Sequence, residues 1–195
     1  VPRDVLDRYR VISHDCDAND MVLCGNTPAG TPVWVNRTFA EADFRLAIGN
    51  LEPHQFMGFS GGVKCAGIGL GGRETINTNH SMMNLPGALL GRYDDNPVRQ
   101  DLEAVGRLMG VHFALNAVLN AHKDIVDVLA GDPVAVMQAG IPRVRAIVAQ
   151  EIAEPFDLVI TSPGGYPKDI NLYQAQKSLA HAALVTREGG AVIMP

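Results

Sequence analysis

The sequence predicts an α/β protein of two domains, the second a doubly wound, Rossmann-like domain that is only partly present. Predicted strands and helices alternate along the chain, as they do in α/β folds. The continuous apolar run Phe156–Thr161 is typical of a parallel strand covered on both faces, and a glycine-rich loop, a helix and a strand follow it. The crossover of this unit should be right-handed. Glu154–Pro155 marks the boundary, which assigns residues 1–154 to the first domain and 155–195 to the second.

The first domain is expected to open with short strands. Arg8–Ser13 and Pro32–Asn36 are both rich in β-branched and aromatic residues, and the turn-forming segment Gly25–Gly30 lies between them. Phe44–Gly49 reads as a buried strand. Its carboxyl end would deliver residues 52–54 to a site, because ligands of α/β sheets usually bind at the carboxyl ends of strands.

Three helices are predicted in the rest of this domain. The first covers Arg73–Met83. The second runs from Asn96 to about Met109, because asparagine is a good N-cap and the proline after it suits the first helical position. The same signal at Asp132–Pro133 starts a helix that extends to about Ile152. Pro142 lies inside this last helix and should kink or break it.

A hairpin and the second-domain elements complete the expected fold. Val111–Asn120 alternates apolar and polar residues and should pair with Ile125–Leu129 across a tight turn. In the second domain, Asp169 is expected to cap a helix that runs to about Thr186. A turn at Glu188–Gly190 should lead into the strand Ala191–Met194.

The ends of the chain suggest a piece of a longer protein. The chain begins at Val1 without a methionine and stops at Pro195, directly after an apolar run. A strand that has just begun is an unlikely natural terminus, so we expect further chain on both sides.

Composition narrows the classes of function. Sixteen basic and 21 acidic side chains give a net charge of −5, which argues against a nucleic-acid-binding surface. Neither a membrane-spanning apolar run nor a signal-peptide pattern is present in the sequence. The three cysteines include no CxxC spacing, which favours a reduced, cytoplasmic protein. His14, Cys16 and Cys24 match no zinc-binding spacing.

The centre of the chain holds an unusual stretch with seven glycines between Gly58 and Gly72, and Lys64 is the one lysine among them. Glycine belongs where a chain turns tightly or where a ligand approaches the backbone. Lys64 could therefore form a covalent link or bind phosphate, or it could be an ordinary surface lysine.

Two histidines flank this stretch. His80 lies on the predicted helix, and its imidazole would suit nickel, zinc or iron, although a lone helical histidine is often an ordinary polar residue. His54 follows a proline that restricts its backbone, and the near-neutral pKa of histidine suits proton transfer. Gln174 and Lys177 share one helix face beside Tyr173, and this face could bind a ligand or be simply exposed.

Three segments together resemble the signature of the lactate racemase family, which uses a nickel-pincer nucleotide. These segments are Glu52-Pro-His54, Gly58-Phe-Ser-Gly-Gly-Val-Lys64 and Glu74-Thr-Ile-x-x-Asn-His80. Ser162–Lys177 resembles the second-domain motif of the same family. The resemblance covers the whole chain but only the middle of a typical member, and it implies an active site between two α/β domains.

The resemblance also implies roles for individual residues. Lys64 would carry the cofactor through a thioamide, His80 would ligate the nickel, and His54 would be one of two histidine acid/bases. The second histidine would precede the matched region. Gln174 and Lys177 would contact the substrate, and Tyr173 would line the same pocket.

The reaction implied by the resemblance is a transient oxidation of a 2-hydroxy acid. A histidine removes the hydroxyl proton, and the α-hydrogen moves as hydride to the pincer carbon of the cofactor. Hydride then returns to either face of the 2-keto acid. The implied partners are a small 2-hydroxy acid and the proteins that synthesise the cofactor.

Two departures from the family pattern leave the substrate open among 2-hydroxy acids. Val63 stands where several members have arginine, and the segment Cys65–Gly72 lacks an expected proline. Two other functions also remain open. Gly67–Gly72 matches GxGxxG, with Asp94 about twenty residues on, as in an NAD-dependent dehydrogenase. A non-catalytic fragment that binds nucleotide or metal is the other alternative.

Overall fold

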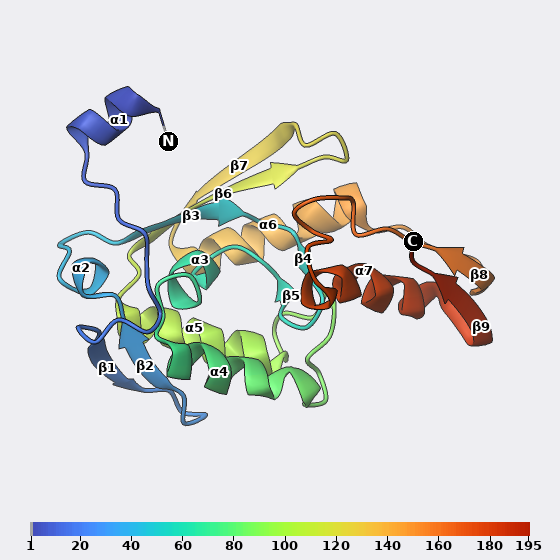
Figure 1. Ribbon diagram of the computed structural model, residues 1–195, viewed down its shortest axis with the longest axis horizontal. Coiled ribbons are helices and arrows are strands. Elements are labelled where there is room, and N and C mark those ends of the chain that lie inside the picture. The colour runs from blue at the N-terminus through green and yellow to red at the C-terminus, as the bar shows by residue number, and fades with distance from the viewer. Residues whose placement is uncertain (1) are drawn as a thin grey trace. The chain divides into compact units, whose positions relative to one another are not determined.

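The computed structural model describes residues 2–195 as a mixed α/β chain in two compact units, residues 2–144 and 145–195 (Figure 1). The predicted α/β class is confirmed. The units divide within the helix α6 (Pro133–Val148), whereas the sequence places the domain boundary after this helix. The domain limits 1–154 and 155–195 therefore stay predictions.

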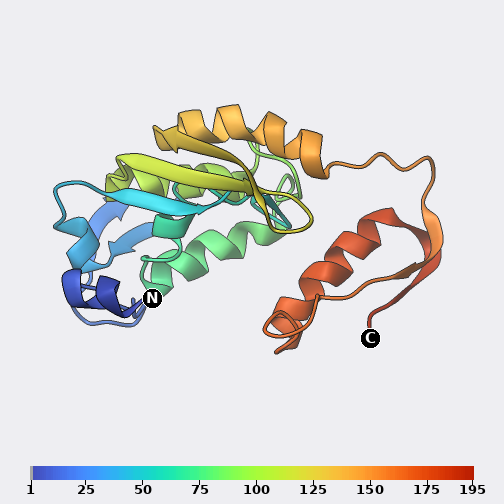
Figure 2. The same cartoon turned by 90° about the horizontal axis from the view of Figure 1, so that it is seen from above.

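The first unit is built on a sheet of β3 (Leu46–Asn50), β6 (Phe113–Leu119) and β7 (Ile125–Gly131), in the order β3-β6-β7. β3 runs parallel to β6, and β6 and β7 form the predicted antiparallel hairpin. The helix α6 lies alongside β6 and β7 in both views (Figures 1 and 2). Its apolar residues pack with one face of the sheet in a common core cluster, which includes Ala114, Val118, Leu129, Met137, Ile141 and Val144.

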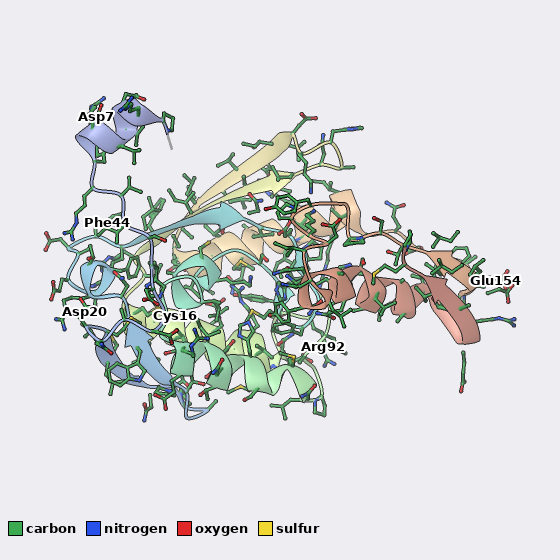
Figure 3. All side chains as sticks on the ribbon, in the orientation of Figure 1. Asp7, Cys16, Asp20, Phe44, Arg92 and Glu154 are labelled. Atoms are coloured by element: carbon green, nitrogen blue, oxygen red, sulfur yellow. The ribbon has the colours of Figure 1, made fainter. Side chains whose placement is uncertain are left out.

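The expectation that Phe44–Gly49 is a buried strand is wrong in two respects. β3 starts at Leu46, and its side chains alternate between a buried face and an open one. Ala47 is 3% exposed, whereas Ile48 and Phe44 are each 62% exposed. Phe44 is labelled in Figure 3. Within the described residues only one face of this sheet is covered, so alternate residues of the strand remain in contact with solvent.

A second core cluster surrounds α5 (Pro97–Met109). Asn96 caps this helix as predicted, because its side chain accepts a hydrogen bond from the backbone N–H of Arg99. The strands β1 (Val22–Asn26) and β2 (Pro32–Val35) form an antiparallel hairpin that packs against the helix. Val33 and Val35 of β2 belong to the same apolar cluster as the buried residues of α5.

Three short elements follow β3 and carry the predicted site. They are the hairpin β4 (Pro53–His54) with β5 (Gly58–Phe59), the single turn α3 (Lys64–Gly67) and the helix α4 (Arg73–Ser81). A 3-10 turn, Met82–Asn84, extends α4 and completes the helix predicted over Arg73–Met83. The short helix α2 (Arg37–Ala40) lies between β2 and β3.

Of two other predictions for this unit, the strand at Arg8–Ser13 is wrong, and the break that was one of the two expected effects of Pro142 does not occur. Arg8–Ser13 forms no strand; the chain has a short helix α1 (Arg3–Arg8) instead, and the following residues find no strand to pair with. Pro142 does not break α6, which is one continuous helix. The apolar face of α6 packs against the sheet on both sides of this proline, and that burial offsets the backbone hydrogen bond that proline cannot donate.

The second unit is the predicted strand–helix–strand unit. β8 (Phe156–Ile160) pairs in parallel with β9 (Thr186–Ile193), and α7 (Leu172–Val185) connects them. β9 is longer than predicted and includes Glu188–Gly190. The expected turn is replaced by an irregularity in the pairing, where Phe156 and Leu158 of β8 pair with Thr186 and Ala191.

Two details of this unit differ from the sequence prediction. The side chain of Asn171, rather than Asp169, caps α7 by accepting a hydrogen bond from the N–H of Gln174 at 3.0 Å. The strand β8 is not covered on both faces among the described residues, since Ile160 is 70% exposed. In residues 2–195 we find no helix with both the length and the apolar character needed to cross a membrane.

Candidate functional site

The carboxyl end of β3 leads directly into the predicted site, as the sequence indicated. The chain leaves β3, forms the β4–β5 hairpin with His54, turns at Gly61 and Gly62, and starts α3 at Lys64. Both glycines have positive φ angles, +96° and +58°, which a residue with a side chain rarely adopts. This turn explains why two glycines precede the lysine.

The phenyl ring of Phe56 contacts both predicted site histidines. Its centroid is 4.8 Å from that of His54 and 5.2 Å from that of His80, and both contacts are edge-to-face. Phe56 is 7% exposed, so this contact belongs to the core. The ring thereby links the β4–β5 hairpin to α4 and brings both imidazoles into contact with one side chain.

A backbone hydrogen bond orients the ring of His54. The N–H of Met57 donates to Nδ1 of His54 at 3.3 Å. When the imidazole is neutral, its own proton therefore sits on Nε2. A neutral ring held in this way presents Nε2–H as a hydrogen-bond donor.

The surroundings of His80 favour its neutral form. Burial, and secondly the charge of the Lys64 ammonium, lower the pKa of His80 below its ordinary value. Lys64 is therefore close enough to His80 to act on it electrostatically. The Nδ1 atom of His80 is buried without a well-formed hydrogen bond among residues 2–195, although an interaction with the backbone of Ile76 partly opposes the fall in pKa. A neutral imidazole is the form that binds metal ions.

Lys64 lines a pocket of about 320 Å³. The other residues of the described chain that line it are Asn50, Glu52, Ser60, Gly61, Cys65, Ile68 and Gly69. Neither site histidine lines this pocket. Lys64 is connected to His80 by the electrostatic effect on its pKa, and His80 is connected to His54 through the ring of Phe56. Burial raises the pKa of the neighbouring Cys65 thiol, which keeps it protonated near neutral pH.

Two buried polar side chains fix the elements around the site, and sequence reasoning missed both. Asn116 on β6 accepts from the N–H of Gly62 at 2.8 Å and donates to the carbonyl of Gly49 at 3.1 Å. Asn79, next to His80, donates to Asp101 on α5 at 2.9 Å. For Asn116 the available sequence signal was a polar residue in the middle of an apolar strand. Asn79 lies in a largely polar helix and gave no such signal.

Asp101 also connects α4 and α5 to the β1–β2 hairpin. Its carboxylate accepts from the hydroxyls of Thr27 at 2.5 Å and Thr31 at 2.9 Å, in addition to Asn79. The aspartate is 4% exposed, and three donors compensate the loss of its hydration. The helix that carries His80 is thus anchored at the residue before it.

The predicted substrate residues lie together on α7 in the second unit. The ammonium of Lys177 donates to Oε1 of Gln174 at 2.8 Å and lies 5.8 Å from the ring centroid of Tyr173. Tyr173 is 57% exposed. The three residues form one polar group at the first turns of the helix, as their spacing predicted.

Two other histidines, His14 and His112, make structural contacts. His14 donates from Nε2 to the carbonyl of Gly71 at 2.9 Å. Nδ1 of His112 accepts from the backbone N–H of Arg45 at 3.0 Å. Both rings therefore connect separate segments of the backbone.

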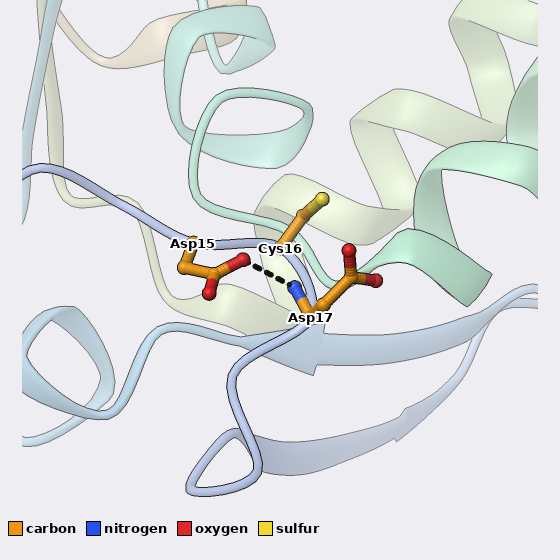
Figure 4. Close-up of side chains that lie close together, drawn as sticks. All are labelled: Asp15, Cys16 and Asp17. Atoms are coloured by element: carbon orange, nitrogen blue, oxygen red, sulfur yellow. Dashed lines mark hydrogen bonds between the residues drawn. The ribbon is translucent and has the colours of Figure 1, made fainter.

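Asp15, Cys16 and Asp17 lie close enough for their side chains to share a metal ion (Figure 4). Asp15 Oδ1 accepts from the N–H of Asp17 at 2.9 Å, and Asp17 forms an ion pair with Arg73. That pair lowers the pKa of Asp17. Both aspartates are exposed, and local hydrogen bonds and the arginine account for their arrangement.

The dinucleotide-binding pattern Gly67–Gly72 lacks the structure that it requires. The fingerprint needs a strand directly before the first glycine, whereas this segment follows the helical turn α3. Its last glycine, Gly72, is the N-cap of α4 and contacts Trp34. The structural context therefore does not favour the dehydrogenase.

Comparison with known proteins agrees with the resemblance. The family described as the lactate racemase N-terminal domain matches residues 1–91, and the lactate racemase C-terminal domain matches residues 152–195. The chain is 34% identical over 194 residues to a lactate racemase of Lactiplantibacillus plantarum and 33% identical to one of Thermoanaerobacterium thermosaccharolyticum. These matches cover 98% of this chain, and 46% and 45% of those proteins.

Solved structures give the same result. The lactate racemase apoprotein from T. thermosaccharolyticum superimposes with a TM-score of 0.91 over 98% of this chain and 46% of that chain, at 33% identity. A protein from Thermotoga maritima shares the fold, with a TM-score of 0.64 and 21% identity over 76% of this chain and 42% of that chain. The chain spans about half the length of the curated relatives that it matches. From these matches, we conclude that the chain belongs to the lactate racemase family.

Proposed function

We propose that the whole protein is an isomerase that racemises or epimerises a small 2-hydroxy acid, lactate or a similar compound, with a nickel-pincer nucleotide. Both curated relatives are lactate racemases, and they match nearly all of this chain. The observation that carries the proposal is the grouping of His54, Phe56 and His80, with Lys64 near enough to lower the pKa of His80.

The residues of the first unit fit such a cofactor. Lys64 lines a pocket and would carry the nucleotide covalently, and the imidazole of His80, whose neutral form is favoured by burial, would ligate the nickel. The cofactor, when bound, supplies a carbon that accepts and returns hydride. A metal that the cofactor already holds needs few protein ligands, which agrees with one histidine at this position.

His54 would act as an acid/base on the substrate hydroxyl. Its Nδ1 accepts from the backbone N–H of Met57, so a neutral His54 carries its proton on Nε2. Proton uptake by this ring would use the lone pair of Nδ1 and would release the hydrogen bond from Met57. Inversion at carbon 2 uses both faces of the substrate, so a second base is required opposite His54. We assign this role to none of the other histidines of the chain, which are His14, His112, His122 and His181.

The second unit would bind the substrate. The Lys177 ammonium suits a carboxylate or a developing negative charge on the substrate oxygen, and Gln174 fixes the position of that ammonium. Tyr173 would cover the same site. Exclusion of water would protect the oxidised form of the substrate. The proteins that synthesise the cofactor would be the partners that load Lys64.

A racemisation screen of the full-length protein, produced together with the cofactor-synthesis proteins, tests this proposal. Single enantiomers of lactate and other 2-hydroxy acids are incubated and separated by chiral chromatography. We expect one acid to be racemised. If the protein instead releases a dinucleotide and reduces it with substrate, the dehydrogenase is correct; an unmodified Lys64 without turnover favours a non-catalytic protein.

His54→Ala should retain nickel and lose racemisation by roughly 10²- to 10⁴-fold, which is the usual contribution of a general acid/base. Metal content and initial rates are measured on the same preparation. His122→Ala, in the exposed turn between β6 and β7, is the matched control and should keep full activity. Full activity in His54→Ala would remove this residue from the mechanism.

A further inference from the structure

Arg99 is a fully buried charged residue that the proposed reaction does not use. It lies on α5 with an exposed fraction of 0%, and its Nε and Nη2 atoms donate to Oε1 of Glu103 at 2.8 and 2.6 Å. The ring of Tyr93 stacks on the guanidinium at 5.1 Å, and its hydroxyl donates to Glu103 at 2.9 Å. The charge of Arg99 is therefore balanced inside the core.

Its remaining hydrogen bonds go to the loop that precedes Lys64. Nη1 donates to the carbonyl of Phe59 at 3.0 Å, and Nη2 donates to the carbonyl of Gly61 at 3.2 Å. The same Gly61 carbonyl accepts the backbone N–H of Lys64, also at 3.2 Å. One carbonyl oxygen thus joins the guanidinium of Arg99 to the backbone of Lys64.

The backbone turn at Gly61–Gly62 has little room to adopt another conformation. A Cβ atom at Gly62 would lie only 2.8 Å from Nη2 of Arg99 and 2.8 Å from Cγ of Met137. The side chain of Asn116 also accepts a hydrogen bond from the N–H of Gly62, at 2.8 Å. The turn at Gly61–Gly62 is therefore enclosed between α5, α6 and β6, and Arg99 supplies donors for its buried carbonyls.

Stability alone is a weak reason for a buried ion pair at this position. Replacing such a pair by apolar residues of similar volume is often neutral or stabilising, because burying the charges costs hydration energy. The planar guanidinium can donate to two carbonyls and a carboxylate at once, which an apolar side chain cannot do. The position of the Arg99 guanidinium is explained by its hydrogen bonds to the carbonyls of Phe59 and Gly61.

We propose that Arg99 is a positioning residue for Lys64, which fixes the Gly61–Lys64 turn so that the lysine amine is presented for attachment of the cofactor. This inference rests on the proposed function of Lys64. It goes beyond that function because it assigns the placement of the amine to a residue of the core that touches neither substrate nor cofactor.

Arg99→Lys tests the proposal in the full-length protein. Lysine keeps a charge near Glu103 but has no planar fork to reach both carbonyls. We expect the fraction of protein with a covalent adduct on Lys64, measured by intact mass, to fall by more than about tenfold, since small displacements of reacting groups are costly. Arg107→Lys, on the exposed side of the same helix, should load normally.

Hydrogen exchange separates positioning from a general loss of stability. In the unloaded protein, Arg99→Lys should accelerate exchange in the segment 60–66 by more than about tenfold and leave the interior of α5 unchanged. Equal acceleration in both segments, or no change in segment 60–66, would overturn the proposal. If Arg99→Lys does not fold, the variant that replaces both Arg99 and Glu103 by Met removes the pair without leaving one charge unpaired, and the same two readouts apply.

The control for the proposed function is the wild-type protein. Absence of an adduct on wild-type Lys64 in a competent host would contradict the proposed function, and the exchange measurement would still decide whether Arg99 positions the turn. A loaded wild type with equal loading of Arg99→Lys would contradict this inference and leave the proposed function standing.

Discussion

At the scale of residues, one aromatic side chain organises the site. The ring of Phe56 contacts both His54 and His80, although these histidines come from a hairpin and a helix that are separate in sequence. The sequence identified the two histidines through the family resemblance. It did not identify Phe56, because a single phenylalanine in a loop carries no signal until its neighbours in space are known.

Phe56→Ala should lower the free energy of unfolding by about 3–5 kcal/mol, because it leaves a cavity in the core. Chemical denaturation monitored by circular dichroism measures the effect. Phe44→Ala is the control: Phe44 is 62% exposed, and its loss should cost no more than about 0.5 kcal/mol. Similar costs for the two variants would mean that Phe56 is not a core residue.

The thiol of Cys65 should be slow to react near neutral pH. Burial raises its pKa, so less thiolate is present at a given pH than for an ordinary cysteine, and thiolate is the reactive form. Alkylation by iodoacetamide, followed by mass spectrometry of the peptide that contains Cys65, should be much slower at pH 8 than in the urea-unfolded chain, and faster at higher pH. Equal rates in the folded and unfolded chains at pH 8 would contradict this.

At the scale of elements, the sequence predicted correctly those features that depend on neighbouring residues, such as the start of a helix. Asn96 and Pro97 predicted the start of α5, and the side chain of Asn96 caps the helix as expected. Arg8–Ser13 has residues that favour a strand, but no strand lies beside it to pair with, so it forms none. Arg99 could not be assigned a role from sequence, since its partners Phe59 and Gly61 are forty and thirty-eight positions away.

Pro142→Ala should stabilise the first unit. Pro142 lies on the exposed side of α6, where it removes one backbone hydrogen bond, and alanine would restore that bond with a better helix propensity. The gain should be at most about 3 kcal/mol, which is the cost of proline in a helix interior. Thermal unfolding measures it, and a lower melting temperature in Pro142→Ala would show that the helix depends on this proline.

At the scale of the whole molecule, the proposed function needs residues from both units. His54, Lys64 and His80 belong to residues 2–144, whereas Gln174 and Lys177 belong to residues 145–195. The strand–helix–strand unit of the second part was predictable from its apolar runs and turn residues. The roles of these residues came from the family resemblance, since periodicity and spacing alone left each of them an ordinary alternative.

Peptide mass spectrometry of the full-length protein, produced with the cofactor-synthesis proteins, tests the central claim most directly. The account predicts an adduct of the mass of the nucleotide on Lys64, which Lys64→Ala lacks, while Lys123, in the turn after β6, stays unmodified. A preparation that racemises its substrate while Lys64 remains unmodified would contradict the account.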